Sequence, residues 1–445
     1  MMQTSSIEQE IQPSRPINKN DTKTLSLASL GGALEFYDFI IFALFAKYMG
    51  DAFFPDTLSP FWKDIGSYGA FAAAYIMRPV GGVIMAHFGD LIGRKRMFAI
   101  SILMMAAPTF AIGLLPTFDT IGFFAPILLL LMRIIQGIAI GGEVPSAWVF
   151  VSEHVPSRKI GLANGFLTCS LTFGILLGAL MALLMEALFP EISSGRTSFL
   201  LGNKQDLHDW GWRIPFLVGG VLGFVTMYLR RWLHETPVFK EMQEKKALSK
   251  GIPLVDALKS YPKSVFVSML LTWLLTCGIL VGLILMPDLM NKSFHIPRHT
   301  VFVMNCLAIL AAVLGCIFWG QLCDKLGAGL SLILGCTCLA ISSYILYAHL
   351  DHTNYTTIGI LYFIMGFCVG SVSVVPYVMI RMFPPNVRLS GVSFSYNLSY
   401  AIFGSSTPLL FVAIVKANPF GMAYYVLTLC AVCILCGFYL IAKKI

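Results

Sequence analysis

The feature that most constrains this chain is a series of apolar runs, each long enough to cross a lipid bilayer. The hydrocarbon core is about 30 Å thick and needs about 20 helical residues. Runs of this kind lie near residues 25–49, 66–88, 97–115, 122–150, 161–187, 212–233, 265–287, 301–322, 330–349, 356–379, 390–415 and 421–442. Their uniform apolarity predicts helices rather than the alternating strands of a membrane barrel. We therefore expect an all-α membrane protein with twelve transmembrane helices.

The composition excludes several other classes. Only 12% of the residues are charged and 57% are hydrophobic, which leaves too little polar surface for a water-exposed globule. The net charge of +8 does not indicate nucleic-acid binding, because the basic residues lie between the apolar runs and are not gathered in one domain. Cys430, Cys433 and Cys436 have no histidine or carboxylate beside them in the sequence, so we expect helix packing there and no metal site. No cofactor is expected, and the scattered histidines do not favour an enzyme.

The distribution of lysine and arginine predicts the orientation. With the N-terminus inside, 21 of the 31 basic residues fall on the inner side, eight at the outer face and two, Arg78 and Arg133, within spans. Such an asymmetry places both termini in the cytoplasm, and we expect a multi-pass protein of a bacterial inner membrane. Residues 1–24 lack the order of a cleaved signal peptide and are expected to form a cytoplasmic tail.

The sequence also divides into two related parts. Residues 234–264 are the longest polar inner stretch, and six predicted spans lie on each side. An Asp-x-x-Gly sequence follows the second span of each part, at Asp90 and at Asp324. We therefore expect two pseudo-symmetric six-helix bundles, 25–233 and 265–442, with 443–445 as a cytoplasmic end. Duplicated units of this kind commonly enclose a binding site near the bilayer midplane.

Several short segments carry a resemblance to a known family. They are LEFYD at 34–38, RPVGG at 78–82, RIIQG at 133–137, GGE at 141–143, DWGWRIP at 209–215 and ETPVF at 235–239. In this order and spacing the chain, from about Leu25 to Ile441, resembles the major facilitator superfamily. It is most similar to the metabolite:H+ symporter group, which includes proline/betaine, α-ketoglutarate, citrate and shikimate carriers. The resemblance implies the major facilitator fold. The loop motif of that superfamily is incomplete here, since Ala86 and Leu91 replace its leading glycine and first basic residue.

Five charges stand out within the predicted spans, where an unpaired charge costs roughly 2.5–3.5 kcal/mol. They are Glu35, Asp38, Arg78, Arg133 and Glu143, all in the first part of the chain. We take these five as candidates for proton coupling. An alternative is that they form a static network that only holds helices together.

The spacing of these charges suggests how they work. Glu35 and Asp38 are three residues apart and project from one helix face. Two carboxylates so near each other in a low dielectric cannot both stay ionised, so one of them holds a proton more tightly. A proton-carrying site needs this property. Arg78 is expected near mid-depth, where it could pair with either. The resemblance implies a role in proton movement or substrate binding for Arg133, and Glu143 is either part of the site or a partner for a loop arginine.

Other residues are candidates for gating and for the substrate cavity. Asp90 at the membrane edge could cap a helix or pair with Arg94 or Arg158, and the resemblance supports a latch there, with Asp324 as its counterpart in the second part. Candidates for the substrate cavity are the polar or aromatic residues Tyr37, Gln136, Trp148, Asn397 and Tyr400. Asn397 and Tyr400 share a helix face, whereas Tyr37 and Trp148 could contribute to an aromatic box for a quaternary ammonium group.

These patterns together predict secondary active transport. We expect a solute to bind between the two bundles, a proton to bind near Glu35 and Asp38, and the bundles to rock. The partners are then a small solute, protons and lipid, and the family usually acts as a monomer. We expect import of a small carboxylate-bearing or zwitterionic metabolite. The alternative is proton-driven efflux, although span 161–187 lacks the proline frequent in family antiporters, which favours symport.

Overall fold

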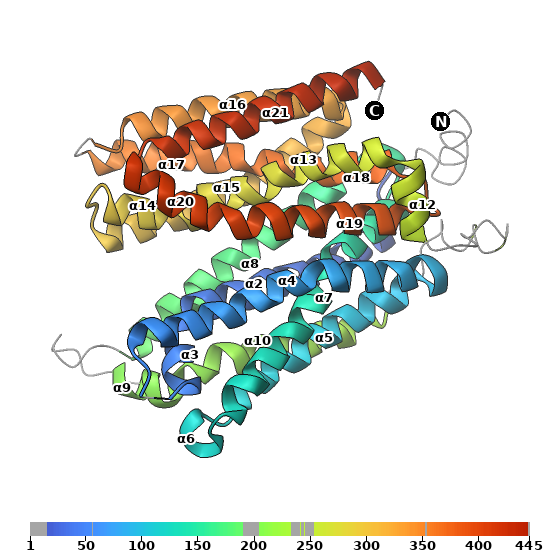
Figure 1. The fold of residues 1–445 in the computed structure, drawn as a ribbon. Helices are drawn as coiled ribbons and strands as arrows, with labels where there is room; N and C mark the ends of the chain where they lie inside the picture. The colour runs from blue at the N-terminus through green and yellow to red at the C-terminus, as the bar shows by residue number, and fades with distance from the viewer. Residues whose placement is uncertain are drawn as a thin grey trace.

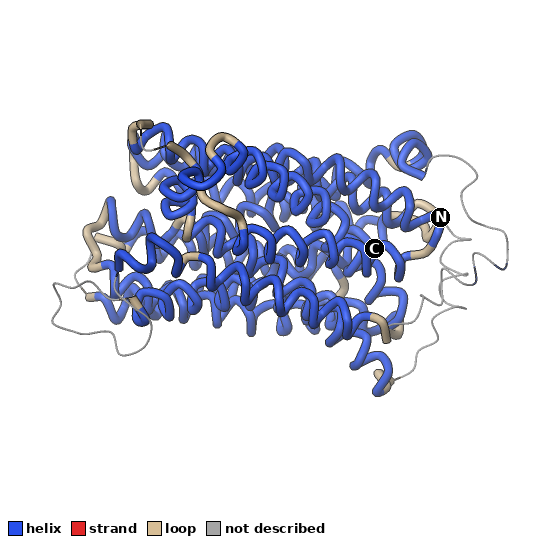
Figure 2. The backbone as a smooth tube through the Cα atoms, turned by 90° about the horizontal axis from the view of Figure 1, so that it is seen from below, coloured by secondary structure: helices blue, strands red, loops and turns tan. Residues whose placement is uncertain are grey.

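The computed structural model describes residues 16–55, 57–189, 204–232, 241, 244, 253–351 and 354–443. Within these ranges the regular structure is helical, and the helices are joined by short loops (Figure 2). The side chains of Asp90, Leu91, Ile92 and Arg94 are among those outside the description, so the predicted gating roles of Asp90 and Arg94 lie beyond what the structure describes.

The first six spans, here called the N-half, run from α2 to α10. Their helices are α2 (Lys19–Leu44), α3 (Ala46–Phe53), α4 (Pro60–Ile92), α5 (Arg94–Leu114), α6 (Phe118–Ile121), α7 (Phe124–His154), α8 (Ile160–Leu188), α9 (Lys204–Asp206) and α10 (Arg213–Arg230), with a 3-10 turn η1 (Ser157–Lys159) before α8 and a π turn η3 (Leu207–Gly211) before α10. Helix α2 begins at Lys19, within the stretch 1–24 predicted as a tail and six residues before the predicted span 25–49. Asn18 and Asp21 form a capping box there, which satisfies the first backbone N–H groups of the helix.

The last six spans, the C-half, run from α13 to α21. Their helices are α13 (Pro262–Ile279), α14 (Met286–Lys292), α15 (Arg298–Leu326), α16 (Ala328–Ala348), α17 (Tyr355–Val369), α18 (Val374–Met382), α19 (Arg388–Ser399), α20 (Ser405–Ala417) and α21 (Gly421–Lys443). Short π or 3-10 turns, η4 (Leu280–Ile284), η5 (Gly370–Ser373) and η6 (Tyr400–Gly404), interrupt three of these spans. The expected loop 234–264 lies largely outside the described residues; its described part holds α12 (Pro253–Ser260).

The helices account for the twelve predicted spans. Among the described residues, eleven helical stretches are long and apolar enough to cross a membrane, and α4 lies at the position of the remaining predicted span. Twelve crossings return the chain to the side on which it began. Figure 1 shows α12 and the end of α21 at one end of the molecule, here called the α12 end, and α3, α6 and α9 at the other, the α6 end.

The two halves meet along a few helices. In the N-half, α4 packs along α7 and α2 along α8, and across the halves α8 packs along α15 while α19 contacts α4 and α7. Figure 1 shows α15 and α19 beside the helices of the N-half. These contacts need close approach of backbones: a Cβ on Gly141 would overlap the carbonyl oxygen of Arg78, and one on Gly165 would come 2.6 Å from the carbonyl oxygen of Cys316. The junction therefore brings the middle of α4 and α7 up to α19.

Candidate functional site

Glu35 lies at the middle of α2 and is 1% exposed. Neither of its carboxylate oxygens has a hydrogen-bond partner among the described residues. Its electrostatic surroundings contain Arg78, Glu143, Arg230 and Asp38. A buried carboxyl group without a partner is costly, so its presence calls for an explanation.

Arg78 projects from the middle of α4 into a group of tyrosines. The centre of its guanidinium lies 4.3 Å from the ring centroid of Tyr400, 5.4 Å from that of Tyr396 and 5.6 Å from that of Tyr75. Its Nη2 donates a hydrogen bond to the Tyr396 hydroxyl at 3.1 Å, whereas Nε has no partner in the described structure. Tyr396 and Tyr400 come from α19 and η6, so this cation of the N-half is held by rings of the C-half. Arg78, Tyr75, Tyr396 and Tyr400 are called the arginine cage below.

The aromatic candidates separate into two groups. Trp148 on α7 is fully buried and packs edge to face on Tyr396, with ring centroids 5.1 Å apart, so it borders the arginine cage. Tyr37 points the other way, into the N-half, where its hydroxyl donates to the carbonyl oxygen of Pro215 at 2.9 Å. The structure thus brings Trp148 and Tyr400 together with Arg78 and leaves Tyr37 apart from them.

Asp38 lies in a separate, well-connected network. Thr109 donates to its Oδ1 at 2.9 Å and Gln136 to its Oδ2 at 2.8 Å, and Arg133 Nη1 is 3.9 Å from Oδ2. Arg133 also donates to the Gln136 side-chain oxygen at 2.8 Å, and its guanidinium lies 3.9 Å from the centroid of Phe42. The two carboxyl groups of α2 therefore differ: that of Asp38 has hydrogen-bond donors and a cation, and that of Glu35 has no donor among the described residues.

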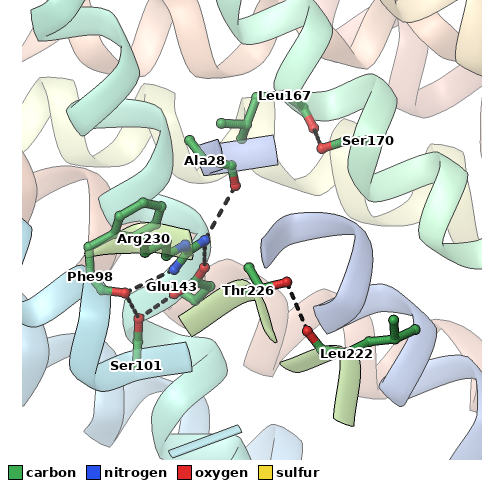
Figure 3. A network of polar contacts seen from close by, with 9 residues as sticks. All are labelled: Ala28, Phe98, Ser101, Glu143, Leu167, Ser170, Leu222, Thr226 and Arg230. Atoms are coloured by element: carbon green, nitrogen blue, oxygen red, sulfur yellow. Dashed lines mark hydrogen bonds and ion pairs between the residues drawn. The ribbon is translucent and has the colours of Figure 1, made fainter. Parts of the chain in front are cut away.

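Glu143 forms an ion pair with Arg230, the last residue of α10. Arg230 Nη2 lies 2.5 Å from Glu143 Oε1, and both side chains are 1% exposed. Arg230 also donates to the backbone oxygens of Phe98 and Ala28, and Ser101 donates to the other Glu143 oxygen (Figure 3). Arg230 lies inside the predicted span 212–233, and this position could have identified it as a further charge within the membrane.

Asn397 connects the halves through backbone oxygens. Its Nδ2 donates to Gly141 O on α7 at 2.7 Å, and Ser393 Oγ donates to Gly82 O on α4 at 3.0 Å. Glycine at 82 is needed for this approach, since a Cβ there would overlap the Asn397 amide. Asn397 therefore lies at the helix junction, close to the chain segment that carries Arg78.

Three polar contacts join the halves at the α12 end. Asp324 at the end of α15 accepts the backbone N–H groups of Gly161 at 2.7 Å and Leu162 at 2.8 Å, so its carboxylate caps the N-terminus of α8. Arg388 Nη1 lies 3.2 Å from Glu153 Oε1, a buried ion pair between α19 and α7. Arg381 donates to the carbonyl oxygen of Ser157 at 3.3 Å. We call these three contacts the α12-end latch; Arg158 lies beside them with an exposed side chain.

A cavity of about 440 Å³ opens between the halves toward the opposite end. Ile40, Leu44, Ile175 and Ala179 line it from α2 and α8, while Asp288, Asn291 and Lys292 line it from α14 and Asn305 from α15. The halves are therefore joined by polar contacts at the α12 end and are separated by a cavity nearer the α6 end.

Comparison with known proteins places this geometry in a family. Residues 28–408 match the Major Facilitator Superfamily. The chain is 32% identical over 412 residues to a putative proline/betaine transporter of Staphylococcus aureus (strain COL), covering 92% of this chain and 85% of that one. It is also 32% identical over 443 residues to a proline/betaine transporter of Escherichia coli (strain K12), covering 93% of this chain and 82% of that one.

Solved structures give the same fold. The proton:xylose symporter XylE bound to 6-bromo-6-deoxy-D-glucose superposes with a TM-score of 0.73 at 17% identity, over 94% of this chain and 95% of that one. The predicted all-α, twelve-helix major facilitator fold is thus confirmed, as is the relation to the metabolite:H+ symporter group. The chain belongs to the Major Facilitator Superfamily and is a multi-pass membrane transporter rather than an enzyme.

Proposed function

We propose that this protein is a proton-coupled importer of a small carboxylate-bearing or zwitterionic metabolite that works by alternating access. The observation that carries the proposal is Glu35, a buried carboxyl group without a hydrogen-bond partner in the described structure. It lies in the electrostatic neighbourhood of Arg78, which itself reaches across the junction of the halves. A group in this position can bind and release a proton as the halves rearrange.

The two carboxyl groups of α2 suit different tasks. Asp38 accepts from Thr109 and Gln136 and lies near Arg133, so these groups offset part of the cost of burying its charge and a fixed role suits it. In the described part of the chain no donor stabilises the ionised form of Glu35, and protonation removes the cost of burying its charge. We assign proton coupling to Glu35 and a supporting role to Asp38 and Arg133, while the Glu143–Arg230 pair fixes helices.

The halves supply the moving parts. We propose that 25–233 and 265–442 act as the two bundles, with 234–264 between them, and that the α12 end faces the cytoplasm of a bacterial cell with both termini there. The excess of basic residues on that side supports this orientation. The α12-end latch then closes the inner side while the cavity opens toward the outside, an arrangement suited to receiving solute from outside.

The substrate class is supported from two directions. The relatives of S. aureus and E. coli are named as transporters of proline and betaine, both of which carry a carboxylate and a cationic nitrogen. In this chain the arginine cage offers a guanidinium for the carboxylate and tyrosine rings for the cationic part.

The test is uptake into proteoliposomes that contain the purified protein. Labelled proline, glycine betaine, α-ketoglutarate and citrate are supplied outside, with and without an inward proton gradient. We expect one of them to accumulate only with the gradient, and we expect Glu35→Gln to abolish the accumulation. Asp119→Asn, which alters an exposed carboxylate on α6, is the matched control and should transport normally.

Three outcomes would count against parts of this proposal. If Glu35→Gln still shows gradient-driven uptake, Glu35 does not carry the coupled proton and has a structural role. Accumulation without any gradient would exclude proton coupling. Expulsion of loaded solute by a proton gradient, with no import, would establish the efflux alternative.

A further inference from the structure

Glu35 and Arg78 are oppositely charged and buried at the junction of the halves. Each has polar atoms that lack a hydrogen-bond partner among the described residues. The oxygens of Glu35 have no hydrogen-bond donor in the described structure, and Arg78 Nε has no acceptor there. They are close enough to interact electrostatically, yet no ion pair joins them among the described residues. The other intramembrane charges differ, since Asp38 and Glu143 both have a cation and hydrogen-bond donors.

We infer that Arg78 anchors the carboxylate of the transported solute and that Glu35 takes up a proton as the solute binds, so that solute and proton bind cooperatively through Arg78. The inference rests on the proposed function and names the chemical group that the site recognises and the pair of residues that couples it to the proton.

The orientation of Arg78 favours a carboxylate ligand. Its guanidinium centre lies 4.3 Å from the centroid of Tyr400, so the ring binds the cation without using any of its N–H donors. Nη2 is used by the Tyr396 hydroxyl, and Nε retains its donor. Guanidinium edges bind planar carboxylates through paired hydrogen bonds, which a lysine cannot reproduce.

The coupling follows from charge. While Glu35 is ionised, Arg78 is the cation that does most to offset its charge. A solute carboxylate bound to Arg78 would weaken the attraction between Arg78 and Glu35 and would also repel Glu35. Interactions of this kind are strong in a buried, low-dielectric site. A proton on Glu35 removes the conflict. Solute at Arg78 therefore strengthens proton binding at Glu35, and by linkage the proton strengthens solute binding by the same factor.

The remaining groups around Glu35 do not replace Arg78 in this role. From α7 and α10, Glu143 and Arg230 face Glu35 but are paired with each other. From α2 itself, Asp38 interacts with Arg133. From α19 and η6, Tyr396 and Tyr400 contribute neutral hydroxyl groups.

The experiment measures binding and proton uptake in the purified full-length protein. Glycine betaine and proline are the probes, and choline and pyrrolidine are their matched analogues without a carboxylate. Binding is followed by calorimetry between pH 5 and pH 8, and proton uptake by a pH indicator in weakly buffered solution. For wild type we expect the carboxylate probe to bind more tightly as pH falls, by up to about tenfold per pH unit for one coupled proton. We expect its binding to take up a proton and the matched analogue not to bind.

The variants separate the two residues. Glu35→Gln imitates the protonated acid, so we expect it to bind the carboxylate probe independently of pH and without proton uptake. Arg78→Lys keeps the charge but loses the paired donors, and we expect roughly ten- to hundred-fold weaker binding. Asp38→Asn tests the other carboxyl group of α2: if Asp38 only supports the site, its affinity can change but binding stays pH-dependent, whereas a proton-carrying Asp38 would make binding independent of pH. Arg231→Lys, on the exposed end of the same half, should match wild type.

Several results would overturn the inference. They are binding of choline or pyrrolidine as tight as that of the carboxylate probes, wild-type affinity without any pH dependence, or loss of pH dependence in Asp38→Asn but not in Glu35→Gln. Absence of binding by both probes, and by α-ketoglutarate and citrate as well, would reject the proposed solute chemistry. Proton-driven uptake in proteoliposomes together with any of the first three results would leave the proposed function standing and reject only this assignment. Binding and proton uptake can both be measured on the wild-type protein, so the inference can still be tested if a variant fails to fold.

Discussion

At the scale of single residues, the buried ion pair between Glu143 and Arg230 has the contacts expected of a structural element. Arg230 binds Glu143 and two backbone oxygens at once, and its guanidinium centre lies 3.6 Å from the centroid of Phe98. Close by, a Cβ at Gly31 would overlap the Arg230 guanidinium, so the pair also determines which residue α2 can carry there. Removing one partner leaves the other charge buried without compensation.

We expect Arg230→Ala to lower the free energy of unfolding by about 3–5 kcal/mol, because Glu143 then keeps an unpaired charge inside the bundle. The double variant Arg230→Met with Glu143→Leu removes both charges and should recover most of that loss. Both are measured by denaturant or detergent unfolding of the purified protein. Arg231→Ala, one residue further on and exposed, is the control and should change stability by no more than about 0.5 kcal/mol. An Arg230→Ala protein as stable as this control would show that the pair contributes little.

The charged residues of the site were predictable from the sequence, but their partners were not. Glu35, Asp38, Arg78, Arg133 and Glu143 stand out because charges are rare in apolar runs. Which of them meet depends on how each helix is rotated and on which helices are neighbours, and a single sequence does not contain that information. The spacing of Glu35 and Asp38 predicted one shared face, whereas the structure connects Asp38 to α5 and α7 and leaves Glu35 without a donor among the described residues.

At the scale of helices, the approach of α4 to α7 depends on glycine. Gly137 and Gly141 face the backbone of α4, where added Cβ atoms would overlap the carbonyl oxygens of Ala74 and Arg78. Small residues allow such approach in membranes, where apolar burial alone does not drive helices together. The same contact positions Arg78, because its own carbonyl oxygen touches α7.

We expect Gly141→Ala to displace α4 from α7 and to destabilise the protein by about 1–3 kcal/mol, as overpacking does. Gly69→Ala is the matched control on α4, since nothing lies within 4 Å of the position that its Cβ would occupy. Thermal unfolding of the two purified variants is compared with that of wild type. Equal midpoints for Gly141→Ala and Gly69→Ala would mean that the helices separate at no cost.

Helix positions were predictable to a few residues, and helix ends and interruptions were not. Hydropathy located the twelve spans because each must cover the same thickness of hydrocarbon. It did not locate the start of α2, which a capping box sets at polar residues. It also did not predict the π turns η4 and η6, which depend on packing rather than on apolar periodicity.

At the scale of the whole molecule, the α12-end latch and the cavity nearer the α6 end lie on opposite sides of the same junction. The duplicated Asp-x-x-Gly sequence predicted two related halves and drew attention to Asp324. It did not predict that Asp324 would cap α8 of the other half, because the partner is a pair of backbone N–H groups with no sequence signature. If the halves rock as rigid bodies, weakening the latch must close the cavity.

This coupling can be measured by labelling from the cavity side. Ala179→Cys places a small thiol in the cavity wall on α8, and its reaction with a charged, membrane-impermeant thiosulfonate reports how often the cavity is open; the protein without this cysteine gives the background. Asp324→Asn removes the charge that caps α8, and a change of about 1.4 kcal/mol in the balance of the two states alters their ratio tenfold. We therefore expect labelling to slow several-fold in Asp324→Asn, with faster amide exchange at Gly161 and Leu162 as evidence that the latch has loosened. Lys325→Gln, an exposed neighbour, should leave both rates unchanged. Faster amide exchange with unaltered labelling would show that the two ends move independently, and a rigid rocking motion would then be excluded.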